Sequence, residues 1–132
     1  MTSKVTYLGE LRTSSIHTAS GAEIISDAPL DNHGKGEAFS PTDTVANALA
    51  SCMLTVMGIK AREMGVAMEG STAEVTKVMQ ATPRKISRIE VKFTMKSDAD
   101  EKTRTILERT ALTCPVHLSL NPDIEKDVVF NW

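Results

Sequence analysis

The stretch Ser40-Pro-Thr-Asp-Thr-Val-Ala-Asn-Ala-Leu-Ala-Ser-Cys-Met-Leu-Thr-Val-Met-Gly58 decides the fold of this chain. Ser40 is a good helix N-cap, Pro41 suits the first helical position, and Asp43 completes a capping-box pattern. With Gly65 as the expected stop, the helix has about 23 residues and a length of ~34 Å, enough to cross a domain. We therefore expect a central core helix, because its apolar residues recur at helical spacing: Val45, Ala48, Leu49, Cys52, Met53, Val56 and Met57.

The sequence on either side of this helix predicts strands and shorter helices. Residues 4–17 and 22–28 predict one hairpin, and residues 69–81 and 84–96 predict a second. Helices are expected at 98–113 and directly after Cys114, followed by a closing strand at 127–132. This order predicts an α+β protein, with antiparallel sheets packed around the long central helix in a single domain, residues 1–132.

Composition excludes several classes of protein. The chain is 41% hydrophobic and 24% charged, and its formal net charge is −2, with acids and bases interspersed. No basic face or tail is present, so we expect neither nucleic acid nor an anionic membrane as a partner. No apolar run approaches the ~18 residues of a membrane span, and the first residues lack a signal-peptide core. We expect a cytoplasmic protein, in which a stable disulfide is disfavoured and a transient catalytic one is possible.

The main candidates for reactive groups in the sequence are the thiols of its two cysteines, Cys52 and Cys114. Cys114 precedes Pro115 at an expected helix start, where free backbone N–H groups favour a thiolate, so this thiol is predicted to be the more acidic. Cys52 lies within an apolar helix face, where burial disfavours its thiolate unless a cation lies nearby. If the fold brings them together they form a redox-active dithiol. Otherwise they are two inert core residues.

Other polar residues are candidate helpers. Arg12, in the first predicted strand, either faces solvent or turns inward to stabilise a thiolate. Asp43 either caps the helix or also orients such an arginine; it is ~13 Å along the helix from Cys52, too far for contact. The chain has three histidines, His17, His33 and His117, and none shows metal-ligand spacing with the cysteines. No phosphate loop or dinucleotide fingerprint is present. We therefore expect no metal and no cofactor.

The segment from Phe39 to Thr55, followed some sixty residues later by Thr-Cys-Pro-Val-His117, resembles the OsmC/Ohr family of osmotically induced and organic hydroperoxide resistance proteins, in particular its OsmC-like branch. The resemblance covers essentially the whole chain and implies an intertwined homodimer with sites at the subunit interface. It also implies a thiol peroxidase. Cys52 attacks an organic hydroperoxide, its sulfenic acid condenses with Cys114 to a disulfide, and an external dithiol, either a small thiol or a lipoyl or thioredoxin-like protein, restores the thiols.

One position departs from the family pattern. The activating carboxylate of the peroxidase branches directly follows the helix-start proline, whereas here that position holds Thr42 and the acid is Asp43. A shift of one residue turns a side chain ~100° around the helix. The family's activating arginine lies near the first hairpin, where Arg12 is the candidate. The departure motivates an alternative function, a catalytically weak OsmC-like dimer that binds an apolar small molecule or lipid.

Overall fold

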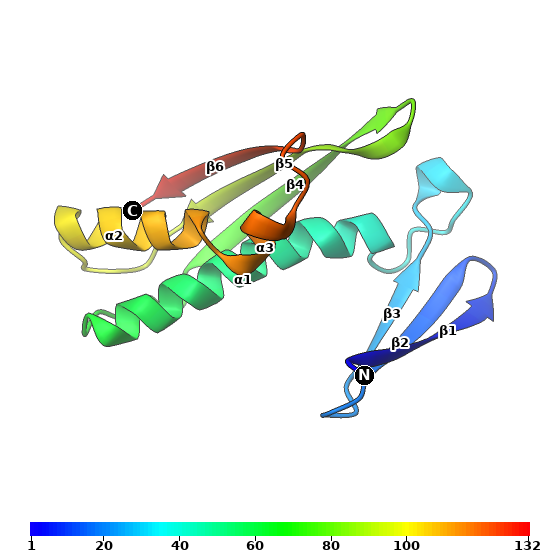
Figure 1. The fold of residues 1–132 in the computed structure, drawn as a ribbon, viewed down its shortest axis with the longest axis horizontal. Coiled ribbons are helices and arrows are strands. Elements are labelled where there is room, and N and C mark those ends of the chain that lie inside the picture. The colour runs from blue at the N-terminus through cyan, green and yellow to red at the C-terminus, as the bar shows by residue number, and fades with distance from the viewer. The chain divides into compact units, whose positions relative to one another are not determined.

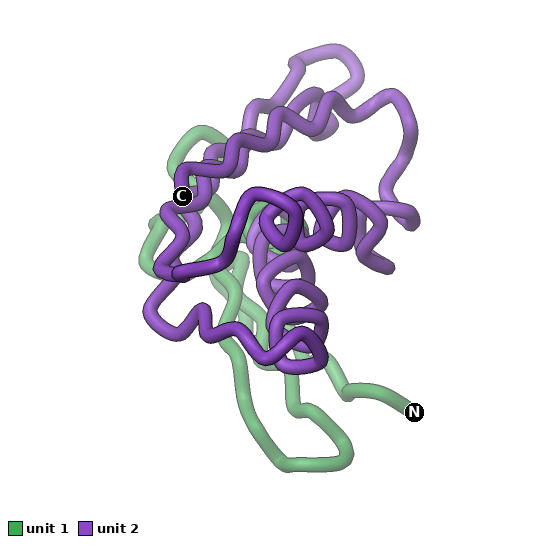
Figure 2. The backbone as a smooth tube through the Cα atoms, turned by 90° about the vertical axis from the view of Figure 1, so that its left-hand side faces the viewer, with its two compact units in different colours: residues 1–45 green, residues 46–132 purple.

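The computed structural model describes all residues, 1–132, and divides them into two compact units, Met1–Val45 and Ala46–Trp132 (Figure 2). The helix and strand order follows the sequence-based expectation closely, with one strand more than expected. The elements are β1 (Ser3–Gly9), β2 (Arg12–His17), β3 (Glu23–Asp27), the 3₁₀ turn η1 (Leu30–Asn32), α1 (Pro41–Glu63), β4 (Thr72–Ala81), β5 (Arg84–Thr94), α2 (Glu101–Leu112), α3 (Pro115–Ser119) and β6 (Glu125–Asn131).

The first unit contains an antiparallel sheet of three strands in the order β1-β2-β3. The expectation of one strand over residues 4–17 was wrong, because the chain reverses between β1 and β2. Gly9, Glu10 and Leu11 all take positive φ angles there, and Gly9 pairs with Arg12 across the turn. Residues other than glycine rarely adopt this conformation, so composition did not mark the turn.

The second unit contains a mixed sheet in the order β4-β5-β6. Strands β4 and β5 form the expected hairpin, but β6 lies parallel to β5, which corrects the prediction of purely antiparallel sheets. The chain between β5 and β6 contains α2 and α3, and such a helical crossover brings the next strand in parallel. Helices α1 and α2 cover one face of this sheet (Figure 1).

The hydrophobic core of the second unit lies between α1, β5 and α2. Leu49, Met53 and Met57 of α1 are fully buried, as are Phe93 of β5 and Leu107 of α2. They share one cluster of buried residues, consistent with the two layers visible in Figure 1. The expected central helix is thus confirmed as a core element. Its apolar face packs on the sheet, as amphipathic helices do.

The start of α1 confirms the predicted capping box. The Asp43 backbone N–H donates to Ser40 Oγ at 3.1 Å, and the Ser40 N–H donates to Asp43 Oδ2 at 2.9 Å. Two backbone donors that a helix start leaves unpaired are therefore satisfied reciprocally. This contact defines where α1 begins, and hence where Cys52 lies along it.

By length and composition alone, α1 is apolar enough to cross a membrane, with a mean hydropathy of 1.3 in its most apolar window. One such helix is weak evidence, because the core helix of a soluble protein passes the same test. Here α1 contributes buried side chains to the protein core: Ala46, Leu49, Ala50, Met53, Met57 and Ala61.

Candidate functional site

The fold brings the two cysteines of the chain together. Cys52 lies in the middle of α1 and is half-buried, whereas Cys114 is the N-cap of α3 and only 1% exposed. Both are free thiols, and they are close enough for Cys52 to raise the pKa of the Cys114 thiol. Both belong to the second unit. The arrangement is therefore a reduced dithiol with one accessible and one buried sulfur.

The environment of Cys114 corrects the expectation that it is the more acidic thiol. Burial raises the pKa of the Cys114 thiol above its usual value, and the adjacent Cys52 raises it further. The His117 backbone N–H donates to Cys114 Sγ at 3.3 Å and acts in the opposite direction, as predicted for an N-cap. Loss of hydration outweighs this bond, because α3 has only five residues and offers a short dipole.

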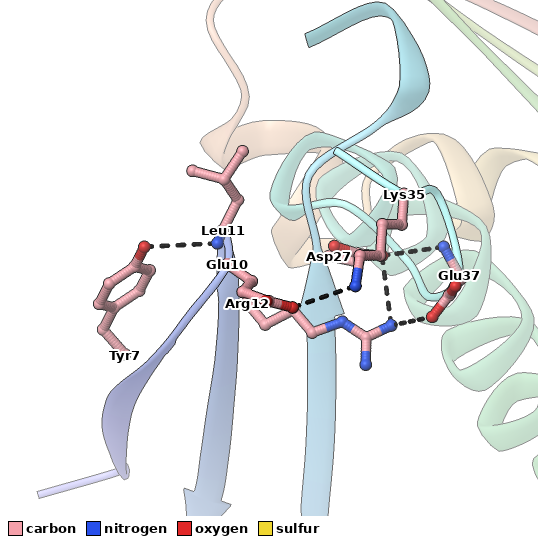
Figure 3. Close-up of polar contacts among 7 residues, drawn as sticks. All are labelled: Tyr7, Glu10, Leu11, Arg12, Asp27, Lys35 and Glu37. Atoms are coloured by element: carbon pink, nitrogen blue, oxygen red, sulfur yellow. Dashed lines mark hydrogen bonds and ion pairs between the residues drawn. The ribbon is translucent and has the colours of Figure 1, made fainter. Parts of the chain in front are cut away.

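Arg12 lies in a cluster of charges within the first unit (Figure 3). Its Nη2 is 3.4 Å from Asp27 Oδ2 and 2.5 Å from Glu37 Oε2. Asp27 has no exposed side-chain surface, whereas the Glu37 side chain is 60% exposed. The Glu37 backbone N–H, 3.0 Å from Asp27 Oδ2, is the main cause of a lowered pKa at Asp27, and Arg12 adds to it. The Arg12 side chain therefore forms ion pairs with Asp27 and Glu37 rather than extending into solvent.

Two of these charged residues were not singled out from the sequence. Asp27 ends a strand and Glu37 lies in a glycine-containing loop, places where acids are common and usually solvated. The useful signal was the strand register, because Arg12 and Asp27 are direct neighbours on β2 and β3. Asp43, which was expected either to cap the helix or also to orient an arginine, forms the capping box of α1.

The four predicted site residues thus fall into two groups. Arg12 and Asp43 belong to the first unit, and Cys52 and Cys114 belong to the second. The structure places the two cysteines near each other and gives Arg12 the partners Asp27 and Glu37. A contribution of Arg12 or Asp43 to thiol chemistry therefore stays a prediction.

None of the described contacts of the three histidines joins an imidazole ring to either cysteine. His17 Nδ1 lies 2.7 Å from Ser20 Oγ in a turn, and His33 ends the 3₁₀ turn in a left-handed conformation. His117 contacts Cys114 through its backbone, and burial lowers the pKa of its imidazole. No group of three or more His, Cys, Asp or Glu side chains is placed to hold a metal ion.

A shallow pocket of about 560 Å³ lies at the C-terminal end of α1, also in the second unit. Its lining combines apolar side chains with one arginine and one glutamate, and neither cysteine contributes to it. The residues are Thr55, Gly58, Ile59, Ala61, Arg62, Gly65, Val66, Ala67, Met68 and Glu69. The pocket is thus separate from the dithiol.

A long central helix carrying one cysteine, packed on a sheet beside a second, buried cysteine, defines an α+β protein with a helix-borne dithiol. The model of the OsmC-like protein family matches residues 34–128, which include both cysteines. The chain therefore belongs to the OsmC-like protein family. A search of curated proteins finds no match to this chain.

Several solved structures share the fold. One is a crystal structure from Psychrobacter arcticus 273-4, provisionally described as an osmotic stress induced and detoxification response protein. It is 58% identical, the match covers 99% of this chain and 96% of that one, and the TM-score is 0.96. The organic hydroperoxide resistance protein OsmC of Legionella pneumophila is 14% identical over 100% and 98% of the chains, with a TM-score of 0.77. The organic hydroperoxide resistance protein OhrB of Bacillus subtilis is 18% identical over 99% and 98%, with a TM-score of 0.68. At such low identities, the last two establish likeness of fold alone.

Proposed function

We propose that this protein is a thiol-dependent peroxidase that reduces organic hydroperoxides, with Cys52 as the attacking thiol and Cys114 as the resolving thiol. The observation that carries the proposal is that the two thiols are neighbours, close enough for Cys52 to raise the pKa of Cys114, in a fold of the OsmC-like family. The hydroperoxide resistance proteins of similar fold from Legionella pneumophila and Bacillus subtilis support the same class of function.

The difference in burial between the two sulfurs supports this division of roles. A hydroperoxide arriving from solvent meets half-buried Cys52 before it meets Cys114, which is 1% exposed. The raised pKa of Cys114 keeps that thiol protonated at neutral pH, and a thiol is a much weaker nucleophile than a thiolate. Cys114 is therefore suited to react with the oxidised Cys52 as the resolving thiol, rather than to attack the hydroperoxide itself.

The proposed cycle balances without a cofactor. The Cys52 thiolate attacks the distal oxygen of the hydroperoxide, the O–O bond breaks to give a sulfenic acid on Cys52, and the alkoxide takes up one proton from solvent and leaves as an alcohol. The sulfenic acid on Cys52 then condenses with the Cys114 thiol, which forms a disulfide and releases water. An external dithiol, either a small thiol or a lipoyl or thioredoxin-like protein, reduces the disulfide by thiol exchange.

Arg12 is the proposed activator of Cys52 in this scheme. A guanidinium favours a neighbouring thiolate by charge and by hydrogen bonding, which would offset the loss of hydration in an apolar helix face. The family resemblance supports this role, and within the first unit Arg12 pairs with Asp27 and Glu37. Asp43 is proposed to orient the activating arginine, and it also holds the start of α1 in place.

A homodimer is part of the proposal, with the whole chain, residues 1–132, as one OsmC-like domain. The family match from residue 34 to 128 spans parts of both compact units, which supports treating them as one domain. Large exposed apolar surfaces mark association sites, and the first unit has six large apolar side chains that are at least 60% exposed: Met1, Val5, Tyr7, Ile24, Leu30 and Phe39. Native mass spectrometry is expected to give twice the chain mass of 14.3 kDa. A monomer at micromolar concentration would contradict the dimer.

The remaining parts of the proposal concern the surroundings of the protein. We place it in the cytoplasm, with no nucleic acid or membrane as partner, because its charges are interspersed and the apolar face of α1 packs in the core. The apolar residues packed near Cys52, such as Met53 and Val56, favour an apolar hydroperoxide.

The first test is the intact mass of the reduced protein after one equivalent of cumene hydroperoxide, followed by trapping of free thiols with N-ethylmaleimide. We expect a mass lower by two hydrogen atoms and no label, because the Cys52–Cys114 disulfide consumes both thiols. Omission of the hydroperoxide is the control and should give two labels, since both cysteines are free.

Unchanged mass with full double labelling after cumene hydroperoxide treatment would argue against the peroxidase. The alternative, a catalytically weak dimer that binds an apolar small molecule or lipid, would then be preferred. The pocket at the end of α1 is the observation that favours this alternative, since Ile59, Val66 and Met68 give it an apolar lining. Saturable binding of a fluorescent fatty acid, lost on Ile59→Asp, would support it.

A further inference from the structure

Trp132, which directly follows β6, joins the end of the second sheet to helix α2 (Figure 1). Its indole Nε1–H donates to Glu108 Oε1 at 2.7 Å, and the guanidinium carbon of Arg104 lies over the indole ring, 5.5 Å from its centroid. Arg104 and Glu108 are one helical turn apart, so they share one face of α2. We call these three residues, Arg104, Glu108 and Trp132, the Trp132 clamp.

Both ends of the Trp132 clamp are attached to hydrogen-bonded backbone. At the sheet end, the neighbouring Asn131 donates from its Nδ2 to the Phe93 carbonyl of β5 at 3.1 Å. At the helix end, Arg104 Nε donates to the Ala99 carbonyl at 2.8 Å. The indole itself is partly buried against the hydrophobic core. The clamp therefore ties α2 to the sheet.

Helix α2 in turn sets the position of Cys114. The Cys114 N–H donates to the Ala111 carbonyl at 3.1 Å, so the backbone of this cysteine is still hydrogen-bonded to α2. The six residues from Glu108 to Cys114 correspond to ~9 Å along a helix axis. Apart from the clamp, α2 is held by its buried residues, Leu107 and Ala111. A rotation or shift of α2 would therefore move the Cys114 thiol with it.

The position of Cys114 matters because a disulfide has a strict geometry. The S–S bond is ~2.05 Å long, and it requires Cα atoms that lie ~4.4–6.8 Å apart. Cys52 lies in the middle of α1, a helix of 23 residues that packs in the core. Cys114 lies at the junction between α2 and α3, and α3 has only five residues. The orientation of α2 therefore decides how readily the two sulfurs meet.

We infer that the Trp132 clamp is a positioning device of the dithiol: by fixing α2, Trp132 and Glu108 hold the Cys114 thiol where it closes a disulfide with Cys52. Both are positioning residues, because they act on the sulfurs through α2. The clamp serves the closure of the disulfide and not the attack of Cys52 on an oxidant. This inference rests on the proposed function in one respect, the Cys52–Cys114 disulfide itself.

The test measures the equilibrium of the reduced protein with glutathione disulfide. The two thiols give up two electrons and two protons to form the Cys52–Cys114 disulfide, and two molecules of reduced glutathione are released. The equilibrium constant reports the effective concentration of one thiol at the other. We expect Trp132→Phe, which keeps a ring but loses the N–H donor, to lower this constant by about tenfold. Glu108→Ala, which loses the acceptor, should lower it equally. Glu108→Gln should restore it, because the amide oxygen still accepts the indole hydrogen bond.

This equilibrium constant separates positioning from a general effect on stability. A substitution that destabilises the reduced and the oxidised protein equally leaves the constant unchanged, whatever it does to the melting temperature. Glu101→Ala is the matched control, because it removes a carboxylate that stabilises the first turn of the same helix and has no contact with the clamp. It should leave the constant unchanged. The double variant Trp132→Phe/Glu108→Ala should fall no further than either single variant, since both substitutions break one hydrogen bond.

An unchanged constant in either Trp132→Phe or Glu108→Ala would overturn the inference. So would an equal fall in Glu101→Ala or Glu108→Gln, or a further fall in the double variant. Should Trp132→Phe fail to fold, which circular dichroism detects, Glu108→Ala alone decides.

The glutathione measurement also separates this inference from the proposed function, since it uses no hydroperoxide. A protein that ignores cumene hydroperoxide, yet shows a lowered constant in the clamp variants, would refute the peroxidase and keep the role of the clamp. A protein that reduces cumene hydroperoxide, with unchanged constants in those variants, would do the reverse. Absence of any Cys52–Cys114 disulfide at every ratio of oxidised to reduced glutathione would overturn both.

Discussion

Cys52→Ser is expected to lower hydroperoxide consumption to the rate seen in buffer alone, measured with cumene hydroperoxide and excess dithiothreitol. A serine hydroxyl is not ionised at neutral pH and does not form the sulfenic acid that the cycle needs. The remaining cysteine does not replace it, because Cys114 is 1% exposed and burial raises its pKa. No other change to the chain is expected to reduce activity as much.

The control for Cys52→Ser is a check that the variant protein still folds. The substitution changes one atom in a half-buried position that packs against the core, so α1 and the sheet should remain intact. Thermal unfolding followed by circular dichroism should therefore give a transition of similar cooperativity to that of the unmodified protein. Full turnover in a folded Cys52→Ser protein would rule out Cys52 as the attacking thiol.

Cys114→Ser has the second largest expected effect, a loss of cycling with the first reaction preserved. Without the resolving thiol, Cys52 is oxidised once and stays as a sulfenic acid or proceeds to higher oxidation states. Consumption of cumene hydroperoxide should stop after about one equivalent per chain when a dithiol protein such as thioredoxin is the reductant. A dimedone adduct on the Cys52 peptide, detected by mass spectrometry, checks the trapped sulfenic acid.

A comparison with Cys52→Ser makes the Cys114 result specific. Only Cys114→Ser should show both one rapid equivalent and a dimedone adduct, whereas Cys52→Ser should show neither. Sustained turnover of Cys114→Ser with the protein reductant would mean that the reductant acts directly on the oxidised Cys52, and that Cys114 is not needed for catalysis.

Much of the fold follows from local patterns in the sequence. The start of α1 was predictable because Ser40 and Asp43 satisfy backbone donors within three residues of each other, a contact that no distant part of the chain decides. The β4–β5 hairpin was predictable for a similar reason, since its alternating strands are joined by a short turn. Helix α2 begins with an Asp100 cap, a further local signal.

Features that depend on distant neighbours were predicted less well. The turn at Glu10 and Leu11 uses left-handed conformations that their side chains do not favour, so it appeared only in the structure. The parallel pairing of β6 depends on the path of α2 and α3 rather than on the residues of the strand. Asp27 looked like an ordinary strand end, because its burial and its contact with Arg12 arise from strand register.

The sequence by itself determined the α+β class and the central helix, and it singled out the two cysteines as candidate reactive groups, because helix caps, hydrophobic periodicity and residue chemistry are local properties. Only the tertiary structure decided that the two thiols are neighbours, that Cys114 is the buried one with a raised pKa, and that Arg12 pairs with Asp27. The physical reason is that solvation and charge contacts depend on which distant segments surround a side chain. At Cys114, burial outweighs the local effect of the helix start.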